Sequence, residues 1–321
     1  FTDHHLSHAS SAFYPSPFEE ACILTIDGVG EWSTASIAYG NEKEIDMLQQ
    51  LEYPDSLGLL YSAFTYYTGF VTNRGEYKLM GLAPYGEPKY VDLIKENLID
   101  VYQDGSIRLN LDYFGFQNSM MMTNTNFDSL FGGAPRIPET EITQKEMDLA
   151  KSIQVVTEEI VLKMANYAHD LTGSKFLCLA GGVALNCVSN GRLLREGPFE
   201  DIWIQPAAGD AGGSLGAALA WYYHKYGKSR KNNEQTMQGG SYWGPSFSNE
   251  EIESYLVSNS FRWNNMYDYH KVKSGERSKT IAKCIAENKI VAHFSGRMEF
   301  GPRALGSRSI IGDPRNIKTQ S

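Results

Sequence analysis

Three of the seven histidines fall within five positions near the start of the chain, at His4, His5 and His8. In a helix, His4 and His8 lie four residues apart on one face, whereas His5 points about 100° away. Two imidazoles at this spacing can bind one transition metal, as in the H-E-x-x-H zinc motif. A solvated helix face is the alternative interpretation. We expect Asp3, just before the pair, to cap the helix with its carboxylate.

The best candidate for a third ligand is Asp210. It lies in the turn Gln205-Pro-Ala-Ala-Gly-Asp210, which leads into a predicted helix. Two histidines and one carboxylate with open positions suit non-haem iron(II), with zinc and manganese as competitors. We therefore predict a metal site formed by His4, His8 and Asp210. The fold would bring these residues together from the two ends of the first domain.

A glycine turn follows the first predicted strand. Residues 22–27 form a buried apolar run that enters Asp27-Gly28-Val-Gly30, and residues 32–39 alternate as a returning strand. The glycines let the backbone approach a ligand closely, with free N–H groups able to meet phosphate oxygens. A hairpin turn without a ligand uses the same residue types. Both interpretations stay open from the sequence.

A second turn of this kind joins a strand at residues 175–180 to a helix, through Gly181 and Gly182 and on to Asn186. A glycine turn at a helix N-terminus is a ready anion or nucleotide site, because unpaired N–H groups and the helix dipole face the ligand. The stretch lacks both G-x-G-x-x-G and G-x-x-x-x-G-K-[ST], so neither Rossmann nor P-loop chemistry is indicated. With a further strand at residues 201–205, the pattern predicts an α/β domain with a ligand at the strand ends.

An arginine-rich loop lies near the end of the chain, at residues 295–309. It carries Arg297, Arg303 and Arg308 among three glycines and a proline. Guanidinium groups on a backbone of this kind suit bidentate binding of phosphate or carboxylate. A solvated basic loop is the alternative, and the fixed backbone favours anion binding.

The elements between these motifs are predicted from the spacing of apolar residues and from capping and helix-breaking residues. A buried helix is predicted over residues 56–69, capped by Ser56 and ended by Gly69, and a long packing helix over 141–171. Residues 104–142 are rich in Asn, Met, Phe, Gly and Pro and predict an irregular, substrate-facing insertion. Glu76 and Lys78 form either a short surface helix or a polar pair beside a ligand.

A polar, breaker-rich stretch at residues 225–240 is interpreted as a linker. Beyond it, residues 249–257 and 277–288 have helical patterns and residues 290–294 a strand pattern. The predicted domains are therefore 1–235 and 236–321.

Composition excludes several classes. The chain has 321 residues, 42% of them apolar, and a formal charge of −9, which argues against binding to a nucleic-acid backbone. No run approaches 18 consecutive apolar residues, so no transmembrane helix is predicted. The four cysteines form no metal-type pairs, and Cys22 and Cys178 lie in apolar strands, where reduced buried thiols are usual. We expect a cytoplasmic protein.

Five stretches together resemble the O-carbamoyltransferases, a family that includes nodulation-factor and antibiotic-tailoring enzymes. The resemblance runs along essentially the whole chain. The stretches are Asp3-His-His-Leu-Ser-His-Ala, Ile26-Asp-Gly-Val-Gly-Glu, Gly75-Glu-Tyr-Lys-Leu-Met-Gly-Leu-Ala-Pro-Tyr-Gly, Leu179-Ala-Gly-Gly-Val-Ala-Leu-Asn and Gly296-Arg-Met-Glu-Phe-Gly-Pro-Arg-Ala-Leu-Gly-Ser-Arg-Ser.

The resemblance implies a fold and a two-step reaction. The first domain would have the actin-like ATPase (ribonuclease H-like) fold of the tRNA threonylcarbamoyl-transfer proteins, and the second would be YrdC-like. The YrdC-like domain would convert carbamoyl phosphate and ATP, with Mg²⁺ a possible companion of ATP, into carbamoyl-adenylate, releasing pyrophosphate and phosphate. The actin-like domain would then transfer the carbamoyl group to a hydroxyl of a small molecule or oligosaccharide, aided by a metal, usually iron. A homodimer is a possible assembly.

Family positions carry over to individual residues of this chain. His4, His8 and Asp210 match the catalytic metal ligands. The glycine turns around the adenylate are matched by Asp27, Gly28, Gly30, Gly181, Gly182 and Asn186. Arg297, Arg303 and Arg308 match the second-domain motif for carbamoyl phosphate and nucleotide. No general base is assigned, with His5 a speculative choice.

Family members carry a further stretch before the histidines and most of the YrdC-like domain after Arg315. We therefore expect this chain to be a piece of a longer protein, unable alone to make carbamoyl-adenylate. An actin-like sugar kinase or ATPase shares the glycine turns but has no use for the histidine pair. A metallopeptidase would need the Glu of H-E-x-x-H, which this chain lacks. A non-catalytic nucleotide-binding fragment is the remaining alternative.

Overall fold

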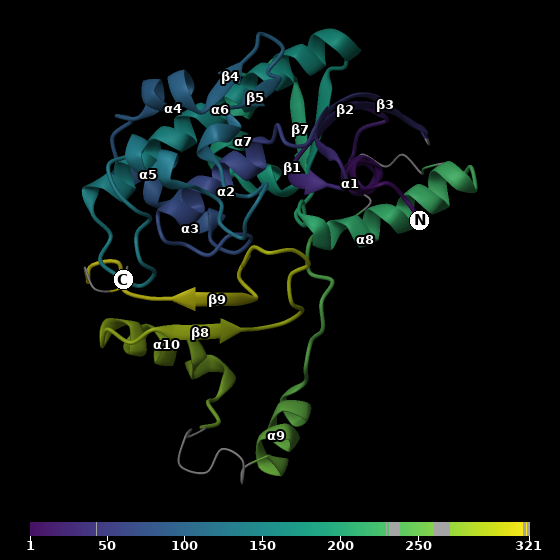
Figure 1. The fold of residues 1–321 in the computed structure, drawn as a ribbon. Coiled ribbons are helices and arrows are strands. Elements are labelled where there is room, and N and C mark those ends of the chain that lie inside the picture. Colours follow the sequence, from purple (N-terminus) through teal and green to yellow (C-terminus); the bar gives the residue numbers. More distant parts are fainter. Residues whose placement is uncertain (43, 229, 231–237, 260–269, 317–318, 320–321) are drawn as a thin grey trace. The chain divides into compact units, whose positions relative to one another are not determined.

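The computed structural model describes residues 1–321 except 43, 229, 231–237, 260–269, 317–318 and 320–321 (Figure 1). The described chain divides into two compact units, Phe1–Gly239 and Gly240–Ser321. The expected boundary between residues 235 and 236 lies outside the described residues. No helix in the described part of the chain is both long enough and apolar enough to cross a membrane.

A five-stranded mixed sheet forms the centre of the first unit. Its strands lie in the order β3-β2-β1-β6-β7, with bounds Glu44–Glu52, Ser33–Asn41, Glu20–Gly30, Phe176–Ala180 and Asp201–Ile204. Strand β2 is antiparallel to both of its neighbours, whereas β1, β6 and β7 run parallel. The predicted hairpin and the two later strands are therefore confirmed, and the chain has a mixed α/β fold.

Helices cover both faces of this sheet (Figure 1). Successive side chains of a strand point to opposite faces, so Leu24 of β1 joins one apolar cluster and Ile23 joins the other. The larger cluster includes α2 (Leu57–Tyr67) and α6 (Gln144–Thr172). The smaller cluster includes α1 (His4–Phe13), against which α8 (Asp210–Leu219) packs.

The remaining elements of the first unit are short. A π-helical turn, Ala220–Lys225, continues α8, and 3₁₀ turns occupy Ala83–Tyr85, Leu111–Tyr113 and Gly182–Leu185. The other helices and strands are α3 (Glu76–Leu82), α4 (Val91–Asn97), α5 (Thr125–Leu130), α7 (Cys187–Glu196), β4 (Ile99–Val101) and β5 (Ile107–Leu109).

The caps confirm the predicted limits of α2, whereas α6 begins at Gln144, three residues after its predicted start. The Ser56 hydroxyl accepts a hydrogen bond from the Leu59 N–H at 3.0 Å, and Gly69 has a left-handed φ of 80° just after α2. Helix α6 ends at Gly173, whose φ is 63°. The predicted carboxylate cap at Asp3 is wrong, because the Asp3 side chain makes no capping hydrogen bond.

The segment 104–142 is more regular than its composition predicts. It contains β5, a 3₁₀ turn and α5, and the rings of Phe127 and Phe131 are buried against Phe64 and Tyr67 of α2. Clustered aromatic residues therefore supply core packing here, which a count of Asn, Gly and Pro does not reveal.

The predicted linker at 225–240 contacts the first unit at two described positions. The Arg230 guanidinium donates to the Ser16 and Phe18 carbonyl oxygens, at 2.9 and 2.8 Å, just beyond the end of α1. The Gln205 side-chain amide donates to the Gln238 side chain at 3.0 Å. These contacts hold both ends of the segment on the first unit.

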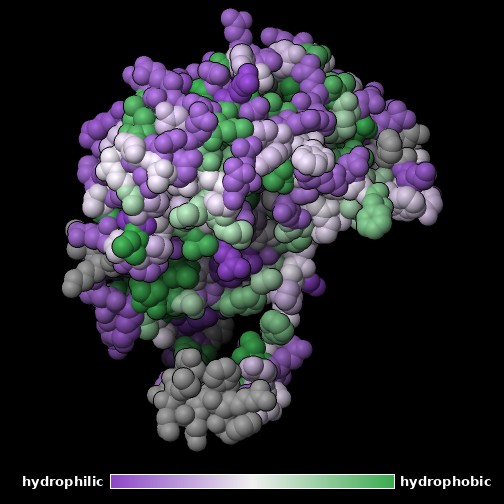
Figure 2. Space-filling view, in the orientation of Figure 1, coloured by the Kyte–Doolittle hydropathy of each residue, from purple (hydrophilic) through white to green (hydrophobic). Residues whose placement is uncertain are grey.

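The second unit contains α9 (Asn249–Ser258), a 3₁₀ turn (Ser274–Glu276), α10 (Arg277–Ala286) and an antiparallel hairpin of β8 (Val291–Phe294) and β9 (Arg308–Ile311). The predicted helices and strand of this region are confirmed. Figure 2 shows hydrophobic residues gathered over the hairpin, and Ile290, Phe294 and Ile310 are exposed there. Neither α9 nor α10 has a buried residue.

Candidate metal centre

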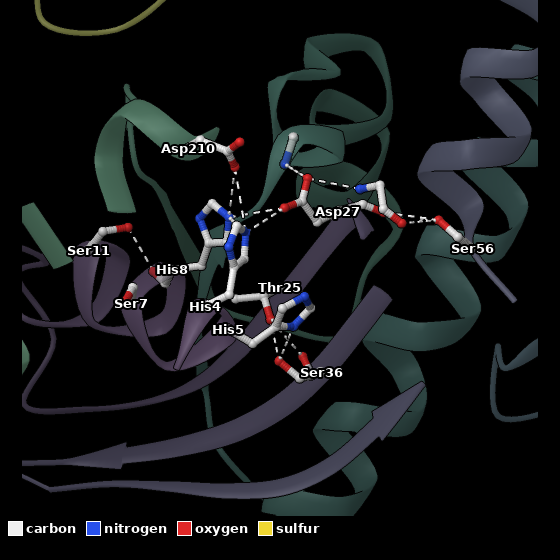
Figure 3. Close-up of polar contacts among 12 residues, drawn as sticks. His4, His5, Ser7, His8, Ser11, Thr25, Asp27, Ser36, Ser56 and Asp210 are labelled. Atoms are coloured by element: carbon white, nitrogen blue, oxygen red, sulfur yellow. Dashed lines mark hydrogen bonds and ion pairs between the residues drawn. The ribbon is translucent and has the colours of Figure 1, made fainter. Parts of the chain in front are cut away.

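Helix α1 brings His4 and His8 to one point on the first unit, as their spacing predicts (Figure 3). Their Nε2 atoms lie 3.0 Å apart. His8 is 1% exposed and His4 is partly exposed, so the pair is not a solvated helix face.

Asp27, three residues before the end of β1, is the member of the cluster that the sequence did not reveal as a candidate ligand. Its Oδ2 lies 3.0 Å from His4 Nε2 and 3.1 Å from His8 Nε2. Its other oxygen, Oδ1, accepts the N–H groups of Gly28 and Gly182 at 2.9 and 3.1 Å. The available signal is a carboxylate directly after an apolar run, but the glycines that follow it favour a phosphate turn instead.

Asp210 completes the cluster from the first turn of α8. Its Oδ1 lies 3.5 Å from His4 Nε2 and 3.6 Å from His8 Nε2. The Asp210 side chain is 79% exposed, so this side of the cluster is open to solvent. The predicted meeting of His4, His8 and Asp210 is what the structure shows (Figure 3).

The four donors fit a divalent transition metal. One ligand atom each of His4, His8, Asp27 and Asp210 lies within 4.8 Å of all the others. Ligands that bind one ion at about 2.0–2.2 Å and at right angles to one another are about 2.8–3.1 Å apart. The three separations among His4, His8 and Asp27 fall in that range. Two imidazole nitrogens and two carboxylates suit iron(II), zinc or manganese rather than calcium.

Electrostatics favour an ionised carboxylate at the centre of the cluster. Burial alone would raise the pKa of Asp27, but hydrogen bonds from His4 and His8 outweigh it and hold the pKa well below the ordinary range. The hydrogen bond with Asp27 in turn raises the pKa of His4 above 6.5. Asp27 is thus an anion that favours a cation beside it, either a proton on His4 or a metal ion.

His5 points away from the cluster (Figure 3). Its Nδ1 lies 2.9 Å from Ser36 Oγ and 3.0 Å from Thr25 Oγ1, in the interior beside β1 and β2. Burial lowers the pKa of His5 to about 4, so the ring is neutral. The suggestion that His5 is a general base is wrong, because the buried side chain faces Thr25 and Ser36.

Most of the glycines that were predicted to meet phosphate groups contact residues of the cluster instead. The N–H groups of Gly28 and Gly182 both point at Asp27. Gly30 packs on His4, and a Cβ there would lie 2.2 Å from the imidazole Cδ2. Gly181 has a left-handed φ of 89° and packs on the Ile26 carbonyl. These turns therefore position side chains of the cluster.

Asn186 has partners of its own. Its side chain caps α7 by accepting the Ser189 N–H at 3.0 Å and donates to the Gln154 side chain at 2.9 Å. Glu76 likewise closes the turn before α3, accepting from Ser62 and from the Asn73 N–H. Both polar groups serve local structure.

The three predicted anion-binding arginines lie in the second unit. Arg297 donates to the Gly244 carbonyl at 3.2 Å. Arg308 pairs with the buried Glu299 carboxylate, its Nε 3.4 Å from Oε2, and also donates to the Gly301 carbonyl. Arg303 lies between them in the sequence and is partly exposed.

Comparison with protein families gives two matches. The family model described as carbamoyltransferase N-terminus matches residues 1–219, which include all four cluster residues. The model described as carbamoyltransferase C-terminus matches residues 282–321, which include the arginine loop.

Three relatives show how far the likeness extends. The uncharacterized protein sll1178 of Synechocystis is 56% identical over 321 residues, covering 100% of this chain and 52% of that protein. Nodulation protein NolNO of Sinorhizobium fredii is 39% identical, covering 98% and 43%, and NolO of Bradyrhizobium diazoefficiens is 36% identical, covering 98% and 53%. The chain spans about half the length of the curated relatives it matches.

Two solved structures of HypF show a weaker likeness. The T. kodakarensis protein has a TM-score of 0.36 at 16% identity, covering 73% of this chain and 38% of that one. A full-length HypF in the phosphate- and nucleotide-bound form has a TM-score of 0.40 at 14% identity, covering 68% and 42%.

Proposed function

This chain belongs to the carbamoyltransferase family, and on that premise we propose that it carries the metal-assisted transfer site of an ATP-dependent O-carbamoyltransferase. The observation that carries the proposal is the cluster of His4, His8, Asp27 and Asp210, four donors at one open point of the first unit. A sugar kinase of similar fold would have no use for such a set.

The proposed reaction has two steps. In the first, water cleaves phosphate from carbamoyl phosphate, and an oxygen of the resulting carbamate attacks the α-phosphorus of ATP, which releases pyrophosphate and gives carbamoyl-adenylate. In the second, an acceptor hydroxyl oxygen attacks the carbamoyl carbon. The C–O bond to AMP breaks, AMP leaves with the bonding pair, and the hydroxyl proton passes to a base. A bound metal ion supplies a Lewis acid that polarises the carbonyl and lowers the pKa of the hydroxyl.

The cluster residues have separate tasks in this scheme. His8 and Asp27 are fixed by burial, and Asp27 is oriented further by the Gly28 and Gly182 N–H groups. The exposed Asp210 lies on the solvent side, where acceptor and adenylate would approach. The donor set is therefore rigid at its base and open at one edge.

We propose that the first unit is an actin-like, ribonuclease H-like domain and that the second belongs to a YrdC-like domain. The strand order β3-β2-β1-β6-β7, with β2 antiparallel to its neighbours, supports the first assignment. The carbamoyltransferase C-terminus match supports the second. In that domain Arg297, Arg303 and Arg308 would bind the phosphate groups of carbamoyl phosphate and ATP.

Metal analysis of anaerobically purified protein tests the central proposal. We expect about one iron, zinc or manganese ion per chain, lost in the double variant His4→Ala/His8→Ala. His270→Ala, which changes an exposed histidine outside the cluster, is the control and keeps the metal. A wild-type protein that takes up none of these metals, even when they are added, contradicts the proposed site.

A further inference from the structure

Glu299 is a buried carboxylate in the middle of the arginine loop. Its side chain has no exposed area, in a unit whose two described α-helices bury no residue. An isolated buried charge is strongly unfavourable unless hydrogen bonds and an opposite charge compensate it. The contacts that compensate Glu299 show what the carboxylate holds in place.

Three backbone N–H groups converge on one oxygen of this carboxylate. Oε1 accepts from Leu305 at 2.7 Å, from Ser307 at 2.8 Å and from Arg308 at 3.3 Å. These donors span the turn at Gly306, whose φ of 110° lies in the left-handed region. The carboxylate thus fixes the backbone that returns from the loop into β9.

The other oxygen of Glu299 faces a cation from the same loop. Oε2 lies 3.4 Å from Arg308 Nε, and the Arg308 guanidinium also donates to the Gly301 carbonyl. Burial alone would raise the pKa of Glu299, but the N–H groups of Leu305, Ser307 and Arg308 lower it to about 2. The pair is therefore charged at neutral pH.

The start of the second unit holds the other side of the loop. The Phe300 N–H donates to the Ser241 carbonyl at 2.6 Å, and the Phe300 ring stacks on Trp243. The Tyr242 hydroxyl donates to the Leu305 carbonyl at 2.7 Å. With both flanks fixed, the segment between Glu299 and Leu305, which carries Arg303, has defined ends.

We propose that Glu299 is a positioning residue, which with Arg308 as its internal counter-ion shapes the 299–308 loop so that Arg303 presents its guanidinium to a phosphate-type dianion. This inference rests on the proposed function, in which the loop binds the phosphate of carbamoyl phosphate. It gives Arg308 a further role, which is to hold the loop through its pair with Glu299.

Binding of carbamoyl phosphate, with inorganic phosphate as a second probe, tests the inference by calorimetry on the whole chain. Glu299→Gln keeps the shape of the side chain but removes its charge. We expect it to bind carbamoyl phosphate about tenfold more weakly, which corresponds to the loss of one charge-assisted hydrogen bond. Arg303→Met should weaken binding more than Glu299→Gln does, and the double variant should bind no more weakly than Arg303→Met alone. Glu287→Gln is the matched control, because Glu287 is exposed and pairs with Lys289 in the same unit.

A spectroscopic measurement on the wild-type protein keeps the test decisive if Glu299→Gln does not fold. With ¹⁵N-labelled Leu, Ser and Arg, added carbamoyl phosphate should shift the side-chain Nε signal of Arg303. The backbone amide signals of Leu305 and Ser307 should stay in place, because Glu299 already holds them.

The outcomes separate the inference from the proposed function. Wild-type binding with unchanged affinity in Glu299→Gln overturns the positioning role alone. Displacement of the Leu305 and Ser307 signals by the ligand also overturns it, since the dianion then competes with Glu299. Absence of any binding to the wild-type chain overturns both the inference and the proposed anion site.

Discussion

Asp27 is the residue on which the donor cluster centres, because both histidines lie within about one hydrogen-bond length of the same carboxylate oxygen. We predict that Asp27→Asn lowers metal affinity by more than the roughly 10–100-fold that loss of an outer partner costs. Competition with a chromogenic chelator measures the affinity. The exposed Asp46→Asn serves as control. Unchanged affinity in Asp27→Asn would remove Asp27 from the ligand set.

The stability of the second unit should depend on pH through the ionisation of Glu299. The pKa of Glu299 is lowered from 4.5 to about 2 in the folded chain. A carboxyl whose folded pKa is depressed contributes stability above its unfolded pKa and loses it as pH falls through the folded value. We predict that the amide proton shifts of Leu305 and Ser307 are constant from pH 7 to about pH 4 and titrate with a midpoint near the folded pKa of about 2.

The variant Glu299→Gln supplies the comparison for this titration. Its loop should show no such transition, because the amide does not ionise. If Glu299 titrated with a midpoint near 4.5 in the wild-type protein, its pKa would not be lowered. That result would contradict the prediction that the three backbone hydrogen bonds dominate the pKa of this carboxyl group.

At the scale of elements, the meeting of α1 and α8 decides whether Asp210 reaches the histidines. Gly216 of α8 packs on α1, and a Cβ there would lie 1.7 Å from the Ser7 carbonyl oxygen. We predict that Gly216→Ala forces the helices apart, destabilises the first unit by about 1–3 kcal/mol and weakens metal binding. Thermal unfolding and chelator competition measure the two effects.

The same helix offers a matched control. A Cβ at Gly213 would meet no atom within 4 Å. Gly213→Ala should therefore stabilise the protein by about 0.5–1 kcal/mol, because Ala loses less backbone entropy on folding. Equal effects of the two substitutions would contradict the close packing of α1 on α8.

Local patterns in the sequence predict elements better than they predict which atoms those elements bring together. The spacing of His4 and His8 gives their shared helical face, and the capping residues give the limits of α2. The glycines after Asp27 suggest a phosphate turn, whereas in the fold the N–H groups of Gly28 and Gly182 bind the Asp27 carboxylate, whose other oxygen lies beside His4 and His8. The contacts of Asp27 with Gly182, His4 and His8 join residues far apart in the sequence, so no local pattern reveals them.

The segment 104–142 and Glu299 are two further cases in which local sequence does not predict a tertiary contact. Breaker residues predict irregular backbone, but the core position of Phe127 depends on α2 packing over it. The arginines of the final loop suggest anion binding, and only the three N–H groups around Glu299 show that Arg308 has an internal partner. Burial of a charge is a property of the folded chain.

At the scale of the whole molecule, the two units differ in how much apolar surface they bury. The first unit contains both apolar clusters, whereas neither α9 nor α10 of the second has a buried residue. Stability scales with buried apolar area, so the second unit should unfold first. We predict two calorimetric transitions for the chain, with early loss of amide protection confined to residues 240–321.

Metal binding identifies which transition belongs to which unit. All four donors lie in the first unit, so a metal that binds only the folded cluster raises only that transition. At a free metal concentration of 100 times Kd the gain is about 2.7 kcal/mol, equivalent to about 5–10 °C for a unit of this size. The His4→Ala/His8→Ala variant should show no shift. A single transition, or an equal shift of both, would mean that the two units fold as one cooperative body and that the cluster stabilises both.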